Sequence, residues 1–267
     1  MLLPRILSAI VMAALFLGAV FVASSNTFSW SMLGVVLLAG WEWARLSGIK
    51  AQLGRILYAV LVGAICALLG HLNLAQNTLF LAPVLWLLAL YWVARYPDPL
   101  VWRHSIVRLI FGVFVLTATW SALVVLKSSE GFITWVLVLM GLIWGADSGA
   151  YFAGRAFGKR KLAKYVSPGK SWEGVFGGLI ITQIGIVAFS VWSDYSLSSW
   201  FLLAIIALVT ASVSVLGDLM ESLLKRYEEI KDSSQLIPGH GGVMDRVDSL
   251  TAAAPTYVLL LTVFGWL

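Results

Sequence analysis

The sequence predicts an all-α, polytopic integral membrane protein with about nine transmembrane helices. Three observations predict this fold class. Hydrophobic residues make up 60% of the 267 residues and charged residues only 12%, whereas soluble domains average about 25% charged residues. The mean hydropathy is +0.92. The apolar residues also form runs long enough to cross a hydrocarbon layer of about 30 Å.

Nine apolar runs follow one another along the chain. They are residues 6–23, 28–46, 54–72, 78–95, 104–126, 131–153, 172–192, 198–216 and 250–267. The first run, between Arg5 and the small residues Ala23–Ser25, also has the pattern of a secretory signal peptide. We expect it to be an uncleaved transmembrane helix, because similar runs follow it immediately.

The basic residues predict the orientation in the membrane. With a cytoplasmic N-terminus, 17 of the 18 Lys and Arg residues fall on the inner side and only Lys127 falls outside. An odd number of crossings then places the C-terminus outside. Topology therefore explains the net charge of +5, and we expect no nucleic-acid partner. The single cysteine, Cys66, excludes a disulfide framework or a Cys-based metal site.

We divide the chain into two regions of one structural unit. Residues 1–130 are expected to be scaffold helices or a dimer surface, with no chemistry assigned. Glu42 interrupts an apolar run there, and we expect it to reach the inner membrane interface beside Arg45. Residues 131–267 are expected to be the catalytic region. Its cytoplasmic loops are residues 154–171 and 217–249.

The sixth run contains a carboxylate and a row of glycines. Asp147 lies near its cytoplasmic end, and acids within membrane segments often mark functional sites. The alternative is a structural ion pair with Arg155, two turns further on. Gly141, Gly145 and Gly149 recur every four residues, and we expect them to line a face that another helix approaches closely.

The loop after the sixth run ends in S-P-G-K-S-W-E-G. Its Gly-Lys-Ser resembles the end of a P-loop, but that motif requires a glycine where this chain has Lys164, so we reject this interpretation. We expect a turn at Pro168 and Gly169 and then a helix that begins near Ser171. Such a helix start, with Lys170 beside it, suits a phosphate.

A polar stretch, residues 217–248, separates the last two apolar runs. If the eighth helix continues into it, Asp218, Glu221, Ser222 and Lys225 share one face. Ionisable residues within membrane helices are energetically costly, so a group of them at a helix end indicates a functional site. We therefore expect the active site in this stretch.

Four carboxylates are expected to meet at the cytoplasmic membrane boundary: Asp147, Asp218, Asp245 and Asp248. They would repel one another unless cations lay between them, and hard oxygen ligands favour Mg²⁺. Basic residues suited to polyphosphate surround them, namely Lys170, Lys225, Arg226, Lys231 and Arg246. The glycine loop around His240 would wrap an anion, although His240 as a merely structural residue is the alternative. Together these features are typical of phosphoryl or nucleotidyl transfer.

Residues 222–248 resemble the signature of the phosphatidate cytidylyltransferases, also called CDP-diacylglycerol synthases. The signature is S-x-hydrophobic-K-R, four residues, K-D-x-small, two residues, hydrophobic, then P-x-H-G-G-hydrophobic-x-D-R-hydrophobic-D, and every position matches. The D-S-G-A-Y stretch from Asp147 and the S-P-G-K-S-W-E-G stretch also resemble the family. The likeness covers roughly residues 141–267.

The resemblance implies transfer of CMP from CTP to phosphatidate, which gives CDP-diacylglycerol and diphosphate for phospholipid biosynthesis. It implies an enzyme of the bacterial cytoplasmic (inner) membrane whose active site faces the cytoplasm. It also implies a requirement for Mg²⁺, and it leaves open an additional monovalent cation such as K⁺ and a homodimer.

Our assignment of residue roles is a hypothesis. Asp218 and Asp245 are expected to bind the metal, with Asp147 and Asp248 supporting them. The expected catalytic residues are these four together with Lys225 and His240. The expected substrate-binding residues are Lys170, Ser171, Glu173, Glu221, Ser222, Arg226, Lys231, Gly241, Gly242 and Arg246.

Two other function classes stay open as alternatives. Another membrane-embedded lipid phosphotransferase or kinase would use the same chemistry, although the D-G-x-x-A-R pattern of CDP-alcohol phosphotransferases is absent from the chain. A transporter would more often show internal repeats and charges at the membrane midplane, whereas here the acids gather at one face.

Overall fold

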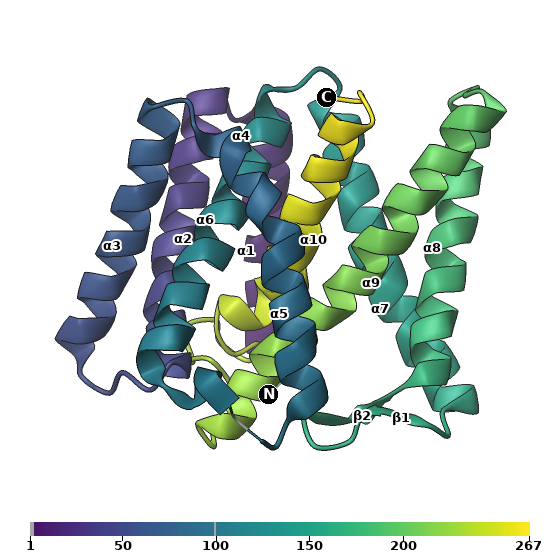
Figure 1. The fold of residues 1–267 in the computed structure, drawn as a ribbon. Helices are drawn as coiled ribbons and strands as arrows, with labels where there is room; N and C mark the ends of the chain where they lie inside the picture. The colour runs from purple at the N-terminus through teal and green to yellow at the C-terminus, as the bar shows by residue number, and fades with distance from the viewer. Residues whose placement is uncertain (1–2, 99) are drawn as a thin grey trace.

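The computed structural model describes residues 3–98 and 100–267, and this part of the chain is almost entirely helical, as the sequence predicts (Figure 1). Its long helices are α1 (Leu3–Leu17), α2 (Ser25–Leu46), α3 (Gln52–His71), α5 (Ala82–Arg95), α6 (Ser105–Ser128), α7 (Phe132–Phe157), α8 (Trp172–Trp192), α9 (Leu197–Tyr227) and α10 (Met244–Val263). Short helical turns are η1 (Gly18–Val22), α4 (Ala75–Thr78), η2 (Leu79–Leu81) and η3 (Leu100–Arg103).

Seven helical segments in the described part of the chain are long and apolar enough to cross a membrane. They are Arg5–Val22, Gln52–His71, Ala75–Arg95, Ser105–Ser128, Phe132–Phe157, Trp172–Trp192 and Leu197–Tyr227. The predicted second and ninth runs are also helices, α2 and α10, but both carry charged residues that lower their hydropathy. Nine crossings, and the sides of the membrane on which the termini lie, therefore stay predictions.

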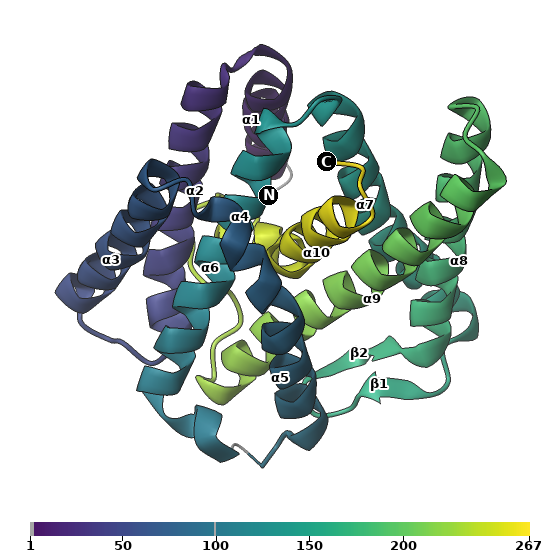
Figure 2. The same cartoon turned by 45° about the horizontal axis from the view of Figure 1, so that its top comes forward.

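Helix α10 lies in the middle of the molecule and joins its two halves (Figures 1 and 2). It packs against α6 on one side and against α9 on the other. Its small residues Ala252, Ala253 and Ala254 are fully buried, which lets neighbouring backbones approach closely. As a result, the start of α10, with its acidic residues, meets the C-terminal half of α9.

Helices α7 and α8 pack closely through glycines. A Cβ added at Gly149 would lie 2.9 Å from Gly177 O and from Gly178 Cα. At Gly145 it would lie 3.7 Å from the Thr182 side chain, while at Gly141 it would meet nothing within 4 Å. The predicted small-residue face is thus confirmed for Gly145 and Gly149, but not for Gly141.

The loop between α7 and α8 forms a two-stranded antiparallel hairpin, β1 (Lys161–Ala163) and β2 (Ser167–Ser171). The prediction of a turn at Pro168 and Gly169 is wrong, because these residues are part of β2. Proline favours an extended residue before it, which suits a strand at this position. The predicted helix start is confirmed: Ser171 caps α8, and its Oγ accepts a hydrogen bond from Gly174 N at 3.2 Å.

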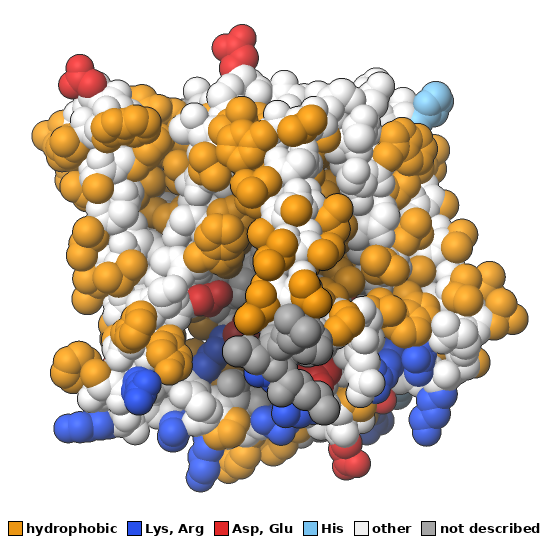
Figure 3. Space-filling view, turned by 180° about the vertical axis from the view of Figure 1, so that it is seen from behind, with side chains coloured by type: hydrophobic (Ala, Val, Ile, Leu, Met, Phe, Trp, Pro, Cys, Tyr) orange, Lys and Arg blue, Asp and Glu red, His pale blue; other side chains and the backbone are white. Residues whose placement is uncertain are grey.

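Charged side chains are distributed unevenly over the surface. Figure 3 shows hydrophobic side chains over the middle of one face and most Lys and Arg side chains along one end. The β1–β2 hairpin lies at this same end (Figure 1). This arrangement matches the one-sided distribution of basic residues that the sequence predicts for a membrane protein.

Candidate functional site

Asp218 is the centre of the first group of polar side chains. Lys170 Nζ, from β2, lies 2.6 Å from Asp218 Oδ2, and Ser222 Oγ donates to Asp218 Oδ1 at 3.1 Å. Asp147 of α7 and Asp248 of α10 both interact electrostatically with Lys170 and Asp218. Lys170 therefore pairs directly with Asp218, and two further carboxylates that are distant in sequence lie close enough to interact with it electrostatically.

A glycine in α9 makes this meeting possible. Gly217 faces α10, and a Cβ added there would come within 2.5 Å of Asp248 O and 2.9 Å of Ala252 Cβ. Since glycine carries no side chain, α9 and α10 can cross in contact at this point. The crossing brings Asp218, the next residue of α9, close to Asp248.

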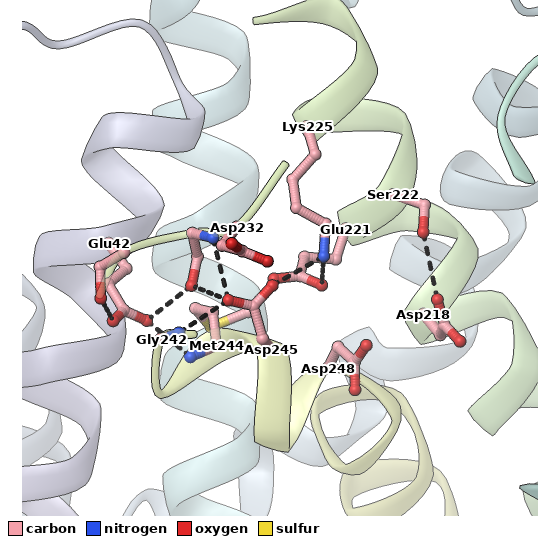
Figure 4. Close-up of polar contacts among 12 residues, drawn as sticks. Glu42, Asp218, Glu221, Ser222, Lys225, Asp232, Gly242, Met244, Asp245 and Asp248 are labelled. Carbon is pink, nitrogen blue, oxygen red and sulfur yellow. Dashed lines mark hydrogen bonds and ion pairs between the residues drawn. The ribbon is translucent and has the colours of Figure 1, made fainter. Parts of the chain in front are cut away.

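Lys225 is the centre of the second group (Figure 4). Its Nζ lies 2.7 Å from Glu221 Oε2 and 2.7 Å from Asp245 Oδ1. The other Asp245 oxygen, Oδ2, accepts hydrogen bonds from Ser233 N at 2.9 Å, Ser233 Oγ at 2.8 Å and Gly242 N at 2.8 Å. Asp245 therefore ties Lys225 of α9 to both ends of the loop that precedes α10.

Glu221 has an unused oxygen between these two groups. Its side chain is only 1% exposed, and Oε1 is buried with no hydrogen-bond partner among the described residues. Glu221 also interacts electrostatically with Asp245 and Asp248. A buried carboxylate oxygen without a donor is costly unless a further positive group or donor reaches it.

The glycine loop around His240 is a tight turn. Ile237 N donates to Gly241 O at 2.8 Å, and His240 N donates to Ile237 O at 2.9 Å. Gly239 and Gly241 have φ angles of +77° and +88°, which other residues rarely adopt. The turn therefore needs its glycines, and it presents the His240 side chain, whose Nδ1 lies 2.7 Å from Ser8 Oγ.

Glu42 of α2 belongs to the site, although the sequence analysis places it at the membrane interface. That expectation is wrong, because Glu42 is 0% exposed. Its carboxylate accepts hydrogen bonds from Ser234 Oγ, Val243 N and Met244 N, and Ser233 Oγ lies 3.1 Å from Oε2. A buried charge is tolerated when it is fully hydrogen-bonded, and here it holds the loop and the first turn of α10 (Figure 4).

Comparison with known proteins identifies the family. The model of the cytidylyltransferase family matches residues 3–264. The chain is 46% identical to the phosphatidate cytidylyltransferase of Pseudomonas aeruginosa over 100% of this chain and 99% of the relative. It is 39% identical to that of Haemophilus influenzae over 96% and 97% of the two chains, and 40% identical to that of Bacillus subtilis over 50% and 49%.

The chain belongs to the cytidylyltransferase family. In this cytidylyltransferase, two residues of the predicted substrate-binding set hold the β1–β2 hairpin. Glu173 accepts hydrogen bonds from Lys159 N at 3.0 Å and from Arg160 N at 3.1 Å. Arg226 Nε donates to Val166 O at 3.3 Å in the turn of the hairpin. The contact of Glu173 and Arg226 with substrate stays a prediction.

The remaining predicted residues of this cytidylyltransferase lie around the two groups. Lys231 and Arg246 are exposed, while Ser171 is buried at the start of α8. Arg155 donates to Tyr151 Oη at 3.3 Å, whereas Asp147 interacts with Lys170 and Asp218. The structure thus favours Asp147 as part of the site over a structural pair with Arg155.

A preformed metal site is not present in this cytidylyltransferase, as far as its described residues extend. Among them, no group of three or more His, Cys, Asp or Glu side chains is arranged to hold a metal ion. The four predicted carboxylates divide between two centres instead. Asp218 pairs with Lys170 near Asp147, Asp245 pairs with Lys225, and Asp248 interacts electrostatically with both lysines.

The sequence did not indicate that Glu42 and Ser233 belong to the site. A carboxylate within an apolar run is a signal that applies to Glu42 as much as to Asp147. The nearby Arg45 made an interfacial position the simpler interpretation. Arg45 Nη1 in fact donates to Ser233 O at 2.7 Å, so both charged residues of α2 face the loop.

Proposed function

We propose that this protein transfers CMP from CTP to phosphatidate at the cytoplasmic face of the bacterial inner membrane, with Mg²⁺ as cofactor. One observation carries the proposal: Lys170 and Lys225, each paired with carboxylates, come together with the glycine loop at the basic end of a membrane protein. Ammonium groups and loop N–H groups bind phosphates, and carboxylates bind the cation that accompanies them.

The chemistry needs alignment and charge neutralisation more than a general base. The phosphate of phosphatidate is largely ionised near pH 7, because its second pKa is about 6. One of its oxygens forms a bond to the α-phosphorus of CTP, while the bond from that phosphorus to the β-phosphate oxygen breaks and diphosphate leaves. Lys170 and Lys225 would neutralise the phosphates, and His240 would donate to a phosphate oxygen.

The side chains present fit a hard divalent cation. Glu221 Oε1 is buried without a hydrogen-bond partner among the described residues, and Asp248 interacts electrostatically with both Glu221 and Asp218 (Figure 4). We infer that Asp218, Asp248 and Glu221 hold the cation, with Asp147 near them, once Lys170 moves from Asp218 to a substrate phosphate. A bound Mg²⁺ would neutralise and polarise the phosphates of CTP.

We propose a role for Asp245 that differs from the predicted role as a metal ligand. Both of its oxygens already accept hydrogen bonds, from Lys225, Ser233 and Gly242. To bind a metal it would have to give up the contacts that hold the loop. We therefore assign it to positioning Lys225 and the glycine loop.

A lipid substrate requires access from the bilayer. Figure 3 shows an acidic side chain at the bottom of a hollow in the hydrophobic face, above the basic end of the molecule. An acyl body could stay in the membrane while its phosphate reaches acidic and basic groups at this depth. This arrangement supports a lipid phosphate as the acceptor rather than a soluble alcohol.

The test is release of diphosphate by purified full-length protein given CTP, phosphatidate and Mg²⁺. We expect activity that requires all three, and a loss of more than about 100-fold in Asp218→Asn, because electrostatic stabilisation is typically the largest catalytic contribution. Glu130→Gln, an exposed acid on the opposite side of the predicted topology, is the matched control and should keep full activity.

Two results would contradict the proposal. Diphosphate release without phosphatidate would indicate a nucleotide hydrolase. Transfer of a single phosphate from CTP to the lipid, seen as CDP rather than CDP-diacylglycerol, would indicate a kinase. Full activity after chelation of divalent cations would disprove the metal assignment and leave the transfer reaction standing.

A further inference from the structure

The first transmembrane helix contacts the glycine loop of the site. Ser8 Oγ of α1 lies 2.7 Å from His240 Nδ1 and 3.1 Å from Pro238 O. The first turn of α1 also lies against Gly239, where an added Cβ would come within 2.6 Å of Arg5 Cγ. Only 6% of the span Arg5–Val22 is buried, so this contact does not result from general core packing.

The neighbours of Ser8 decide the direction of its hydrogen bond to the imidazole. Ser8 Oγ is also 3.1 Å from Arg5 O, so it faces two carbonyl oxygens that can only accept. If Nδ1 carries the imidazole proton, it donates to Oγ at 2.7 Å and the hydroxyl donates to one carbonyl, so two hydrogen bonds form; if Nδ1 is unprotonated, the hydroxyl donates to it and only one forms. The proton on the neutral imidazole therefore belongs on Nδ1.

We propose that Ser8 is a positioning residue for the transfer reaction, which fixes the orientation and the Nδ1-protonated form of His240. Nε2 is then the ring atom left to face a substrate phosphate, and it donates to a phosphate oxygen when the ring takes up a second proton beside the bound anion, while Nδ1–H keeps its contact with Ser8 Oγ. The catalytic part of this inference depends on the proposed function, whereas the tautomer does not.

The tautomer can be measured directly, because the chain contains only three histidines. In ¹⁵N-histidine-labelled full-length protein at about pH 8.5, where an ordinary imidazole is neutral, we expect His240 to carry its proton on Nδ1. Ser8→Ala should convert His240 to mainly the Nε2-protonated form, and His71 and His104 should not change. A wild-type His240 protonated on Nε2 would overturn the inference, whatever the activity.

A double-mutant cycle tests the role in catalysis. One neutral hydrogen bond is worth about 1 kcal/mol, so Ser8→Ala should lower kcat/KM for CTP about 5-fold, and Ser8→Thr, which keeps the hydroxyl, should restore it. In a His240→Ala background Ser8→Ala should cause no further loss. The melting temperature of Ser8→Ala should match that of the wild type.

The possible outcomes separate the inference from the proposed function. An equal loss from Ser8→Ala in both backgrounds would show that Ser8 acts through packing of α1, and no loss in either would show that it has no role. Both results overturn the inference. An Nδ1-protonated His240 in a protein that releases no diphosphate would instead contradict the proposed function.

Discussion

At the scale of single residues, the carboxylates of the site fall into two kinds. Glu42 and Asp245 have both oxygens occupied by hydrogen bonds from the loop and from α10 or Lys225. Asp218 and Glu221 have carboxylate oxygens that can accept a further contact. Asp218 is paired with Lys170, and Glu221 has one oxygen without a partner among the described residues. The first kind positions the loop, and the second kind is suited to a cation.

Glu42→Gln tests the first kind. One Glu42 oxygen accepts Val243 N at 2.9 Å and the other accepts Met244 N at 2.6 Å. In glutamine either orientation places an amide nitrogen against a backbone N–H, so at least one hydrogen bond is lost. Hydrogen bonds to charged groups contribute about 1.5–3 kcal/mol each. We expect a lower melting temperature in detergent and a loss of transfer activity.

The control for Glu42→Gln is Glu229→Gln, which removes the charge of an acid in the same loop at a residue with φ +55°. This variant should retain the melting temperature and most of the activity. A Glu42→Gln protein as stable and active as the wild type would show that the buried contacts of Glu42 do not hold the loop.

At the scale of helices, the crossing of α9 and α10 decides the geometry of the site. Gly217 lets the two backbones meet beside Asp218 and Asp248, and Gly149 does the same for α7 and α8 beside Asp147. Small residues next to these acids therefore let the backbones that carry them pack closely against neighbouring helices. The hairpin between α7 and α8 then supplies Lys170 to the same place.

Gly217→Ala tests this crossing. The added methyl group would meet Asp248 O, a backbone atom that cannot move aside as a flexible side chain can. Overpacking of this kind destabilises a protein by about 1–3 kcal/mol. We therefore expect α10 to shift away from α9 and transfer activity to fall at least 10-fold. Activity and melting temperature are both measured.

The matched control is Gly141→Ala in α7, where an added Cβ meets nothing within 4 Å. Alanine is the better helix former by up to about 1 kcal/mol, so this variant should be as stable as the wild type or more stable. Equal behaviour of the two variants would show that the α9–α10 crossing tolerates a side chain.

At the scale of the whole molecule, the basic end and the apolar middle predict one orientation in the membrane. The single cysteine, Cys66, is buried, and Cys66→Ser provides a background for labelling. With Lys164→Cys in the turn of the hairpin, a membrane-impermeant thiol reagent should react only from the cytoplasmic side. With Ser128→Cys, at the end of α6, it should react only from outside.

Labelling of both positions from the same side would contradict the predicted topology between α6 and the hairpin. Labelling of Lys164→Cys only from outside would place the acidic centre on a side where CTP is not supplied. Agreement at both positions would support the proposed cytoplasmic active site, since Lys164 belongs to the hairpin that supplies Lys170.

Several parts of the molecule could be predicted because they depend on local composition. Apolar runs must be helical in a membrane, where every backbone polar group needs an internal partner, and nearly all of the predicted runs are helices here. The start of α8 at Ser171 follows from the capping preference of serine. The hairpin was missed because its two strands are short and polar, without an alternating apolar pattern.

The sequence by itself determined the fold class, the basic end, the family signature and the residue types of the site. Only the tertiary structure decided which of those residues come together: Lys170 pairs with Asp218 near Asp147 and Asp248, and Lys225 pairs with Glu221 and Asp245. It alone brought in Glu42 and Ser8, from the helices taken for scaffold. The physical reason is that a hydrogen bond depends on distance between atoms, and helix crossings at glycines set those distances between segments far apart in sequence.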